Sequence, residues 1–176
     1  MEDHTLIERT LAGYQQDFEV LVERYQKMLF AFVYRHLQDA DAADEVVQIT
    51  FVQAYTHLAQ FRGAATFKSW LHQIALNQCR SRYRAARARR EVALGDVAEA
   101  ALANPDDEMG SGAERANIER HIGRLPQRQR TVLSLRIFSD LPFKEIARMV
   151  GISENAAKVN YHHAITRLKQ WLTCEG

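Results

Sequence analysis

The sequence predicts an all-α protein with two small helical domains joined by a flexible acidic linker. In both halves of the 176-residue chain, apolar residues recur at three- and four-residue spacing, and no stretch alternates with the period of a strand. Residues 91–113 carry six acidic and no basic side chains, whereas the blocks before and after them carry a basic excess. We therefore expect domains at residues 1–90 and 114–176, with a linker between them that holds a short helix near residues 97–102.

The first two helices of residues 1–90 follow from apolar stripes at helical spacing. One stripe begins at Phe18 and ends at Leu37. The segment "DADAAD", residues 39–44, then offers capping and early acidic side chains, which favour the N-terminus of a second helix. The buried stripe expected on that helix is Val47, Phe51, Ala54, Tyr55 and Leu58.

A loop and a third helix complete the first predicted domain. Gly63 breaks the helical pattern within "QFRGAAT", and Thr66 is expected to cap the helix that follows. This helix continues into the basic run "RSRYRAARARR", residues 80–90, whose charge suits a polyanionic partner. Its expected core residues are Phe67, Trp70, Leu71 and Ile74.

Residues 114–176 are also expected to be helical, and their end resembles a DNA-reading motif in outline. Gly151 can supply a tight turn, and Ser153 can cap the helix that follows. A helix, a glycine turn and a second, capped helix predict a helix-turn-helix, with a plain helical hairpin as the alternative. The buried stripe expected on the last helix is Ala157, Tyr161, Ala164, Ile165 and Leu168.

The opposite face of the last helix determines what the motif could bind. That face and its flanks are expected to present Lys158, Val159, Asn160, His162 and His163. As DNA readers, the two histidines and Asn160 could hydrogen-bond base edges or phosphates, and Val159 could touch a thymine methyl group. A metal site is disfavoured, because adjacent histidines lie about 100° apart around a helix and no acidic or sulfur ligand is one turn away. We expect neither a metal nor a cofactor; an ordinary amphipathic helix is the remaining alternative.

Composition narrows the class of protein and its location. No stretch approaches the ~20 apolar residues of a membrane span, and the N-terminus lacks the basic start and apolar core of a signal peptide. Cys79 and Cys174 form no CxxC pair, so a disulfide framework is not expected. The expected location is the cytoplasm, without membrane insertion. No GxGxxG, P-loop, HExxH or nucleophile motif is present, which disfavours an enzyme.

Three segments in combination resemble the extracytoplasmic-function (ECF) sigma factors of bacterial RNA polymerase, group IV of the sigma-70 family. They are "DEVVQITFVQAY", "FRGAATFKSWLHQIALNQCRSRYR" and "GRLPQRQRTVLSLRIFSDLPFKEIARMVGIS". The resemblance covers nearly the whole chain outside residues 1–15 and 91–113, and sigma factors of cobalt and nickel resistance operons are the relatives expected to be most similar. It implies a sigma-2 domain in residues 1–90 and a sigma-4 domain in residues 114–176.

The resemblance also implies partners. They are core RNA polymerase, bound through its clamp helices and flap, and the promoter DNA on which the protein places it. An anti-sigma factor, often anchored in the membrane, is expected to hold the protein inactive. The alternative is an autonomous helix-turn-helix repressor with a helical ligand or dimerisation domain, which would explain residues 114–176 but neither the FRG segment nor the acidic stretch.

Roles for individual residues follow from the same resemblance. Asp44, Glu45 and Gln48 match the acidic and glutamine positions of the helix that docks on the clamp helices. Ile49 stands where members usually have Glu, and it lies about 200° around the helix from Val47, so we expect it off the core face.

The FRG loop and the helix after it resemble the segment that opens promoter DNA and captures a flipped base of the minus-ten element. The implied minus-ten residues are Phe61, Arg62, Gly63, Ala64, Ala65, Thr66, Phe67, Asn77, Arg80, Arg82 and Arg84. The implied minus-thirty-five readers are Lys158, Val159, Asn160, His162 and His163.

Overall fold

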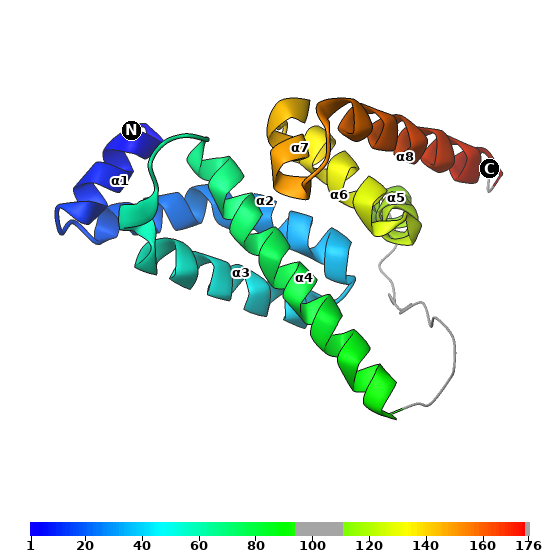
Figure 1. The fold of residues 1–176 in the computed structure, drawn as a ribbon, viewed down its shortest axis with the longest axis horizontal. Helices are drawn as coiled ribbons and strands as arrows, with labels where there is room; N and C mark the ends of the chain where they lie inside the picture. The colour runs from blue at the N-terminus through cyan, green and yellow to red at the C-terminus, as the bar shows by residue number, and fades with distance from the viewer. Residues whose placement is uncertain (94–110, 175–176) are drawn as a thin grey trace. The chain divides into compact units, whose positions relative to one another are not determined.

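The computed structural model describes residues 1–93 and 111–174. Every regular element in these residues is helical, which confirms the all-α prediction (Figure 1). They form two compact units, one with helices α1 to α4 and one with α5 to α8; Tyr34–Gln38, at the end of α2, are counted with the second. Each unit is described below by itself.

The predicted linker differs from the structure at both of its ends. Helix α4 (Phe67–Ala93) continues three residues into it, and α5 (Ser111–Arg124) begins three residues before its end. Glu91 and Ala93 are good helix formers, so the helix that carries the basic run has no local reason to stop at residue 90. Residues 94–110, with the short helix expected near residues 97–102, lie outside the described residues.

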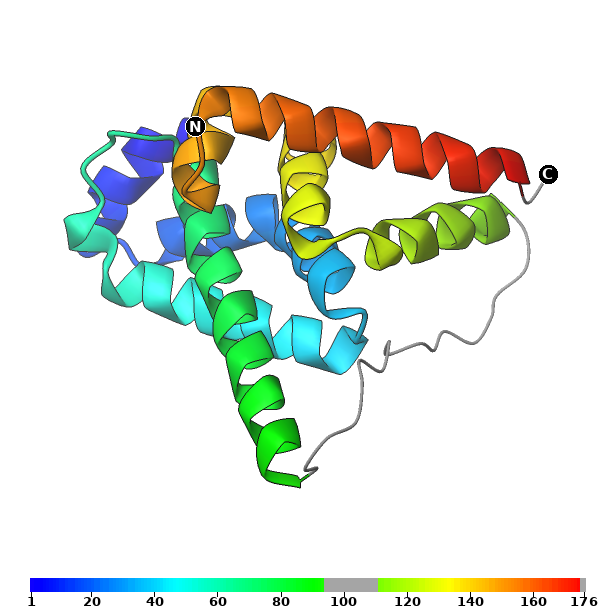
Figure 2. The ribbon, with the colours of Figure 1, turned by 45° about the vertical axis from the view of Figure 1, so that its right-hand side comes forward.

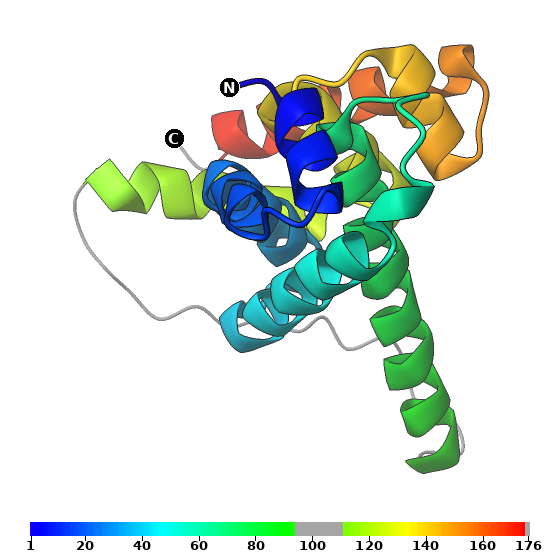
Figure 3. The ribbon, with the colours of Figure 1, turned by 90° about the vertical axis from the view of Figure 1, so that its left-hand side faces the viewer.

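The first unit is a helical bundle in which α3 packs against α4. Its elements are α1 (Asp3–Leu11), α2 (Gln16–Leu37), α3 (Ala40–Thr56), a 3-10 turn η1 (Leu58–Gln60) and α4. Figure 3 shows that the second half of α4 extends beyond α3, as it also does in Figure 1. The core of this unit includes Leu21, Leu29, Phe32, Val46, Phe51, Leu58, Phe67, Leu71 and Leu76.

Local signals set the helix boundaries of this unit where the sequence predicts them. The Asp39 carboxylate accepts a hydrogen bond from the N–H of Ala42 at 2.9 Å and caps α3. The Thr66 hydroxyl accepts one from the N–H of Ser69 at 3.1 Å and caps α4. Gly63 has a φ of 68°, a left-handed conformation that favours glycine. Both predicted caps and the predicted break are therefore confirmed.

Two residues of α3 lie differently from the prediction. Tyr55, expected in the core, is 41% exposed; its ring packs edge-on against Phe18 with centroids 5.0 Å apart, so only part of this amphipathic side chain is covered. Ile49, expected off the core face, is half-buried. Helix α3 contacts α2 through Tyr55 and also packs against α4. The helix is therefore shielded from solvent over more of its circumference than the single predicted apolar stripe covers.

The second unit is organised around its last helix. Its elements are α5, α6 (Gln127–Leu133), a π-helical turn η2 (Ser134–Phe138), α7 (Phe143–Val150) and α8 (Glu154–Cys174). Figure 2 shows α8 spanning the unit, in agreement with its contacts to α5, α6 and α7. The stripe predicted for α8 is confirmed as its core-facing side, since Ala157, Ala164 and Leu168 are buried. The other stripe residues, Tyr161 and Ile165, are half-buried and pack on a cluster that includes Ile122, Leu125 and Leu133.

None of the described helices is both long enough and apolar enough to cross a membrane.

Candidate polymerase and nucleic-acid interfaces

Helices α7 and α8 form the predicted helix-turn-helix. Gly151 ends α7 with a φ of 75°, and its N–H donates to the carbonyl oxygen of Ala147 at 2.9 Å. An added Cβ would meet nothing within 4 Å, so the backbone conformation alone favours glycine here. The Ser153 hydroxyl accepts a hydrogen bond from the N–H of Ala156 at 3.1 Å and caps α8.

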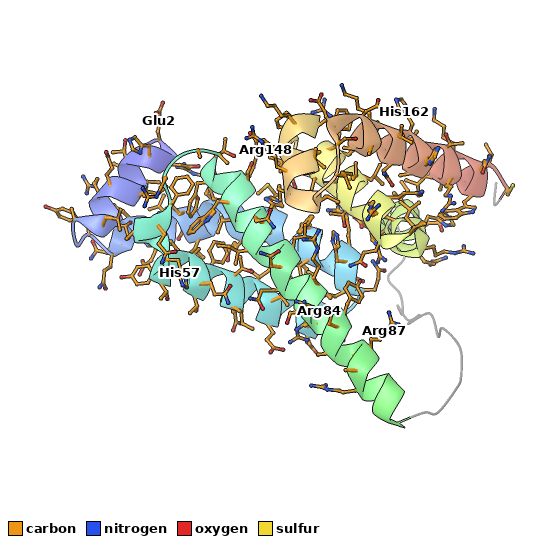
Figure 4. All side chains as sticks on the ribbon, viewed as in Figure 1. Glu2, His57, Arg84, Arg87, Arg148 and His162 are labelled. Atoms are coloured by element: carbon orange, nitrogen blue, oxygen red, sulfur yellow. The ribbon has the colours of Figure 1, made fainter. Side chains whose placement is uncertain are left out.

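The outer face of α8 is exposed as predicted. Val159 is 43% exposed. His162 and His163 are exposed as well, and Figure 4 shows His162 projecting from α8 away from α6. This face therefore offers an apolar group and two imidazoles on one helix that follows a tight turn.

Two members of the predicted reading set are engaged by their own helix. Asn160 is half-buried, and its Nδ2 donates to the carbonyl oxygen of Ala156 at 2.8 Å. Lys158 pairs with Glu154, with 2.9 Å between Nζ and Oε1; the hydrogen bond and the charge of Lys158 lower the pKa of Glu154. To reach a phosphate, Lys158 must therefore leave Glu154.

The two histidines do not assemble into a metal site with other ligands. Within residues 1–93 and 111–174, no group of three or more His, Cys, Asp and Glu side chains is placed to hold a metal ion. The His162 ring instead lies edge-on to Tyr161, with centroids 5.8 Å apart.

A cluster of three aromatic rings lies at the ends of the FRG loop. Phe61, Phe67 and Trp70 have ring centroids 5.3–5.8 Å apart. Phe67 is only 2% exposed, so it lies in the core beneath the loop, whereas Phe61 is half-buried. The exposed residues of the loop are Arg62, Gly63, Ala64, Ala65 and Thr66.

Asn77 lies well along α4, away from the FRG loop residues of the predicted minus-ten set. It is exposed, and its Oδ1 accepts a hydrogen bond from Nε2 of Gln73 at 3.1 Å. Ten residues of helix separate it from Phe67, which corresponds to about 15 Å. The predicted minus-ten set is thus a surface that begins at the loop and extends along the helix.

The second half of α4 is a basic arm. Arg84 and Arg87 are exposed on the part of α4 that extends beyond α3 (Figure 4), while Arg80 is half-buried. Arg82 forms an ion pair with Glu45 of α3. The structure thereby brings together one residue from the predicted DNA surface and one from the predicted polymerase surface.

Exposed apolar residues adjoin the predicted polymerase surface of α3. Asp44, Glu45 and Gln48 are exposed as expected. Val52 is 65% exposed and Tyr55 41%, and both continue the same face. The spacing of residues 45, 48, 52 and 55 is helical, a signal that could have identified the two apolar members.

Comparison with known proteins identifies the class to which these surfaces belong. Residues 21–89 match the family model of sigma-70 region 2, and residues 115–168 match that of sigma-70 region 4. The RNA polymerase sigma-H factor of Pseudomonas aeruginosa is 32% identical over 160 residues, which are 85% of this chain and 82% of the relative. The ECF RNA polymerase sigma-E factor of Escherichia coli is 34% identical over 161 residues, 85% of this chain and 83% of the relative. The chain belongs to the ECF sigma factors of the sigma-70 family.

Solved structures agree with this assignment. The structure of CnrH in complex with the cytosolic domain of CnrY has a TM-score of 0.74 and 26% identity, and covers 99% of each chain. The sigma factor RpoE of Bartonella quintana, solved with the anti-sigma factor NepR, shares the fold with a TM-score of 0.76 at 22% identity, over 90% of this chain and 98% of that one. The family and fold predicted from the sequence are thus confirmed: the protein is a transcription initiation factor that directs RNA polymerase, and it is not an enzyme.

Proposed function

We propose that the two units divide promoter recognition between them. Residues 1–90 bind core polymerase and the minus-ten element, residues 114–176 read the minus-thirty-five element, and residues 91–113 link the two. The observation that carries this proposal is the exposure of different chemistry on the two units. The first presents an acidic and apolar face on α3 and a basic arm on α4, and the second presents the outer face of α8.

The α3 face is the proposed contact with the clamp helices. Asp44, Glu45 and Gln48 supply charge and polarity, and Val52 supplies apolar area that is otherwise exposed to water. Half-buried Ile49 adjoins this face and supports it. The second unit is the proposed contact with the flap.

The exposed tip of the FRG loop and the α4 surface up to Asn77 are the proposed minus-ten site. A captured, unstacked base needs polar edges and an aromatic or apolar wall. At the loop, Arg62 offers a polar group and half-buried Phe61 an apolar wall, while Asn77 offers a polar group to a nucleotide farther along the same strand. Arg80, Arg82 and Arg84 neutralise the DNA backbone beside this site.

The proposed minus-thirty-five readers are the exposed members of the predicted set on α8. Val159, His162 and His163 contact bases, and Lys158 contacts a phosphate. Asn160 is proposed as a secondary DNA contact, because its side-chain amide already donates a hydrogen bond to the carbonyl oxygen of Ala156.

An anti-sigma factor is the proposed regulator. The structures of CnrH and of Bartonella quintana RpoE were solved with CnrY and NepR, which supports a partner of that kind for this chain. The protein would then act in the cytoplasm, with an anti-sigma factor held at the membrane.

Reconstituted transcription tests the proposed division. Core polymerase mixed with the protein should initiate at a promoter upstream of the gene's own operon, whereas an autonomous repressor would confer no initiation. Val52→Asp should weaken polymerase binding at least tenfold, because it places a charge in an apolar contact. Val20→Asp is the matched control, since Val20 is an exposed valine of α2 (40%) outside the proposed face. Equal polymerase affinity for both variants would refute the assignment of α3.

A further inference from the structure

Helix α1 precedes the residues matched by the region 2 model, yet it is firmly attached to the first unit. Leu6 and Ile7 are 1% and 3% exposed. The helix packs against η1, whose Leu58 is also buried and which leads directly into the FRG loop. Attachment at this place puts α1 next to the start of the loop.

Asp3 of α1 accepts hydrogen bonds from two side chains of α2. Its Oδ1 accepts a hydrogen bond from Arg24, and its Oδ2 accepts one from the hydroxyl of Tyr25. Arg24 also donates to the carbonyl oxygen of Met1 at 2.9 Å, which fixes the beginning of the helix. Burial raises the pKa of Tyr25 and the bond to Asp3 raises it further, so the phenol remains a donor.

From Tyr25 the contacts lead to the loop. The Tyr25 ring meets Phe67 edge-on, with centroids 5.9 Å apart at 61°. Phe67 in turn packs against Phe61 at 5.7 Å, with the two rings at 86°. Phe61 is the first residue of the loop and Phe67 is the first residue after it, so this group of rings holds both ends of the loop.

We propose that α1 positions the FRG loop, with Asp3 and Tyr25 as the positioning residues that act through Phe67. The two residues hold the ring cluster so that the loop keeps the conformation in which it receives an unstacked minus-ten base. This inference rests on the proposed minus-ten role of the loop.

A second contact between α1 and α2 provides the control for a purely structural role of α1. Arg9 and Asp17 form a second ion pair between α1 and α2, with 2.5 Å between Nε and Oδ2, at the end of α1 opposite Asp3. Arg9 also stacks over Tyr14, 5.0 Å from its ring centroid. Loss of this pair loosens α1 without touching Tyr25 or the rings under the loop.

The test uses the full chain bound to core polymerase. Two affinities of this complex are measured. One is for a DNA single strand with the minus-ten sequence of a promoter that the wild type opens, and the other is for a strand of scrambled sequence. The readout is the ratio of the first affinity to the second. Asp3→Asn and Tyr25→Phe should lower this ratio roughly three- to tenfold, which is the effect of one lost hydrogen bond transmitted to the loop. Asp17→Asn should leave the ratio unchanged. Affinity for core polymerase should stay within about twofold in all three variants.

The outcomes separate the inference from the proposal beneath it. A wild type that prefers the minus-ten strand, with the same ratio in Asp3→Asn, Tyr25→Phe and Asp17→Asn, overturns the positioning role alone. A wild type without preference overturns the proposed minus-ten site and this inference with it. If Asp3→Asn unfolds, Tyr25→Phe decides, because it keeps the ring and removes only the hydroxyl.

Discussion

Arg82 of α4 is paired with Glu45 of α3, so a residue proposed to bind DNA is neutralised by a residue proposed to bind polymerase. Their side chains are 36% and 61% exposed. A pair so exposed contributes little to stability, typically ~0–1 kcal/mol. The pair matters instead because Arg82 and polymerase compete for Glu45. Contact of Glu45 with polymerase would release Arg82 for a phosphate.

Glu45→Gln should therefore raise the affinity of the isolated protein for duplex DNA of random sequence. We expect a roughly two- to fivefold increase at low salt and a salt dependence that steepens by about one phosphate contact. Fluorescence anisotropy over a salt series measures both. Asp44→Asn removes the same charge from the adjacent position, so equal effects of the two variants would show that net charge, and not release of Arg82, is responsible.

Asn77→Ala should impair promoter opening more than closed-complex binding. Loss of one base contact corresponds to ~1–3 kcal/mol, and the closed complex does not yet expose the bases of the opened strand. Permanganate reactivity reports opening, and gel shift reports total binding. Gln73→Ala is the control because it removes the hydrogen bond to Asn77 and keeps the Asn77 amide. A loss of equal size in closed and open complexes would contradict the assignment of Asn77.

Lys158→Ala should weaken binding to many duplexes alike and reduce the salt dependence by about one phosphate contact. Glu154→Gln should do the reverse, since it frees Lys158 from its pair. Binding of the protein to a panel of duplexes at several salt concentrations measures both variants. Lys27→Ala, an exposed lysine of α2, should change neither quantity. A change in sequence preference in Lys158→Ala would instead indicate a base contact.

His72 should make the first unit less stable in acid. It is buried with its ring 4.9 Å from Phe32, and Nδ1 lies 2.8 Å from the carbonyl oxygen of Lys68. Burial lowers the pKa of His72 to about 4, against about 6.5 for an unfolded chain. The unfolded chain thus binds more protons between these values, so stability is retained above about pH 6.5 and is lost as pH falls toward 4. The loss in the free energy of unfolding is roughly 2 kcal/mol by pH 5.

Urea unfolding at pH 7.5 and pH 5 measures this loss, which should be smaller in His72→Gln. His57 provides the control, because its Nδ1 makes the same bond to a carbonyl four residues earlier, at 2.9 Å to Gln53, while its side chain is exposed (Figure 4). His57→Gln should keep the full pH dependence. A wild type equally stable at both pH values would exclude the buried, neutral state of His72.

The sequence predicted well those features that local chemistry determines. Asp39, Thr66 and Ser153 each cap a helix at the predicted place, because a cap needs only an N–H group three residues ahead. The buried and exposed faces of α8 followed from the helical period. The family motifs added the family, which the comparisons confirm, and expected roles for the surfaces, which stay predictions.

The remaining features depend on contacts between distant residues or on side-chain rotamers. Asp3 and Tyr25 are 22 residues apart, and no local pattern pairs them. The period of α8 places Asn160 on a flank, but its turn back to Ala156 depends on its rotamer. The π-helical turn Ser134–Phe138 is likewise absent from the apolar pattern.

At Gly151 the backbone conformation restricts which residue fits, whereas the space around the Cα does not. Its φ of 75° excludes most L-residues, yet the space where a Cβ would stand is open to 4 Å. L-alanine there would cost roughly 1–2 kcal/mol, whereas D-alanine prefers this conformation and has fewer unfolded states to lose than glycine. A sigma-4 unit assembled by peptide ligation could therefore be stiffened at this turn by a mirror-image residue, with every exposed side chain of α8 left as it is.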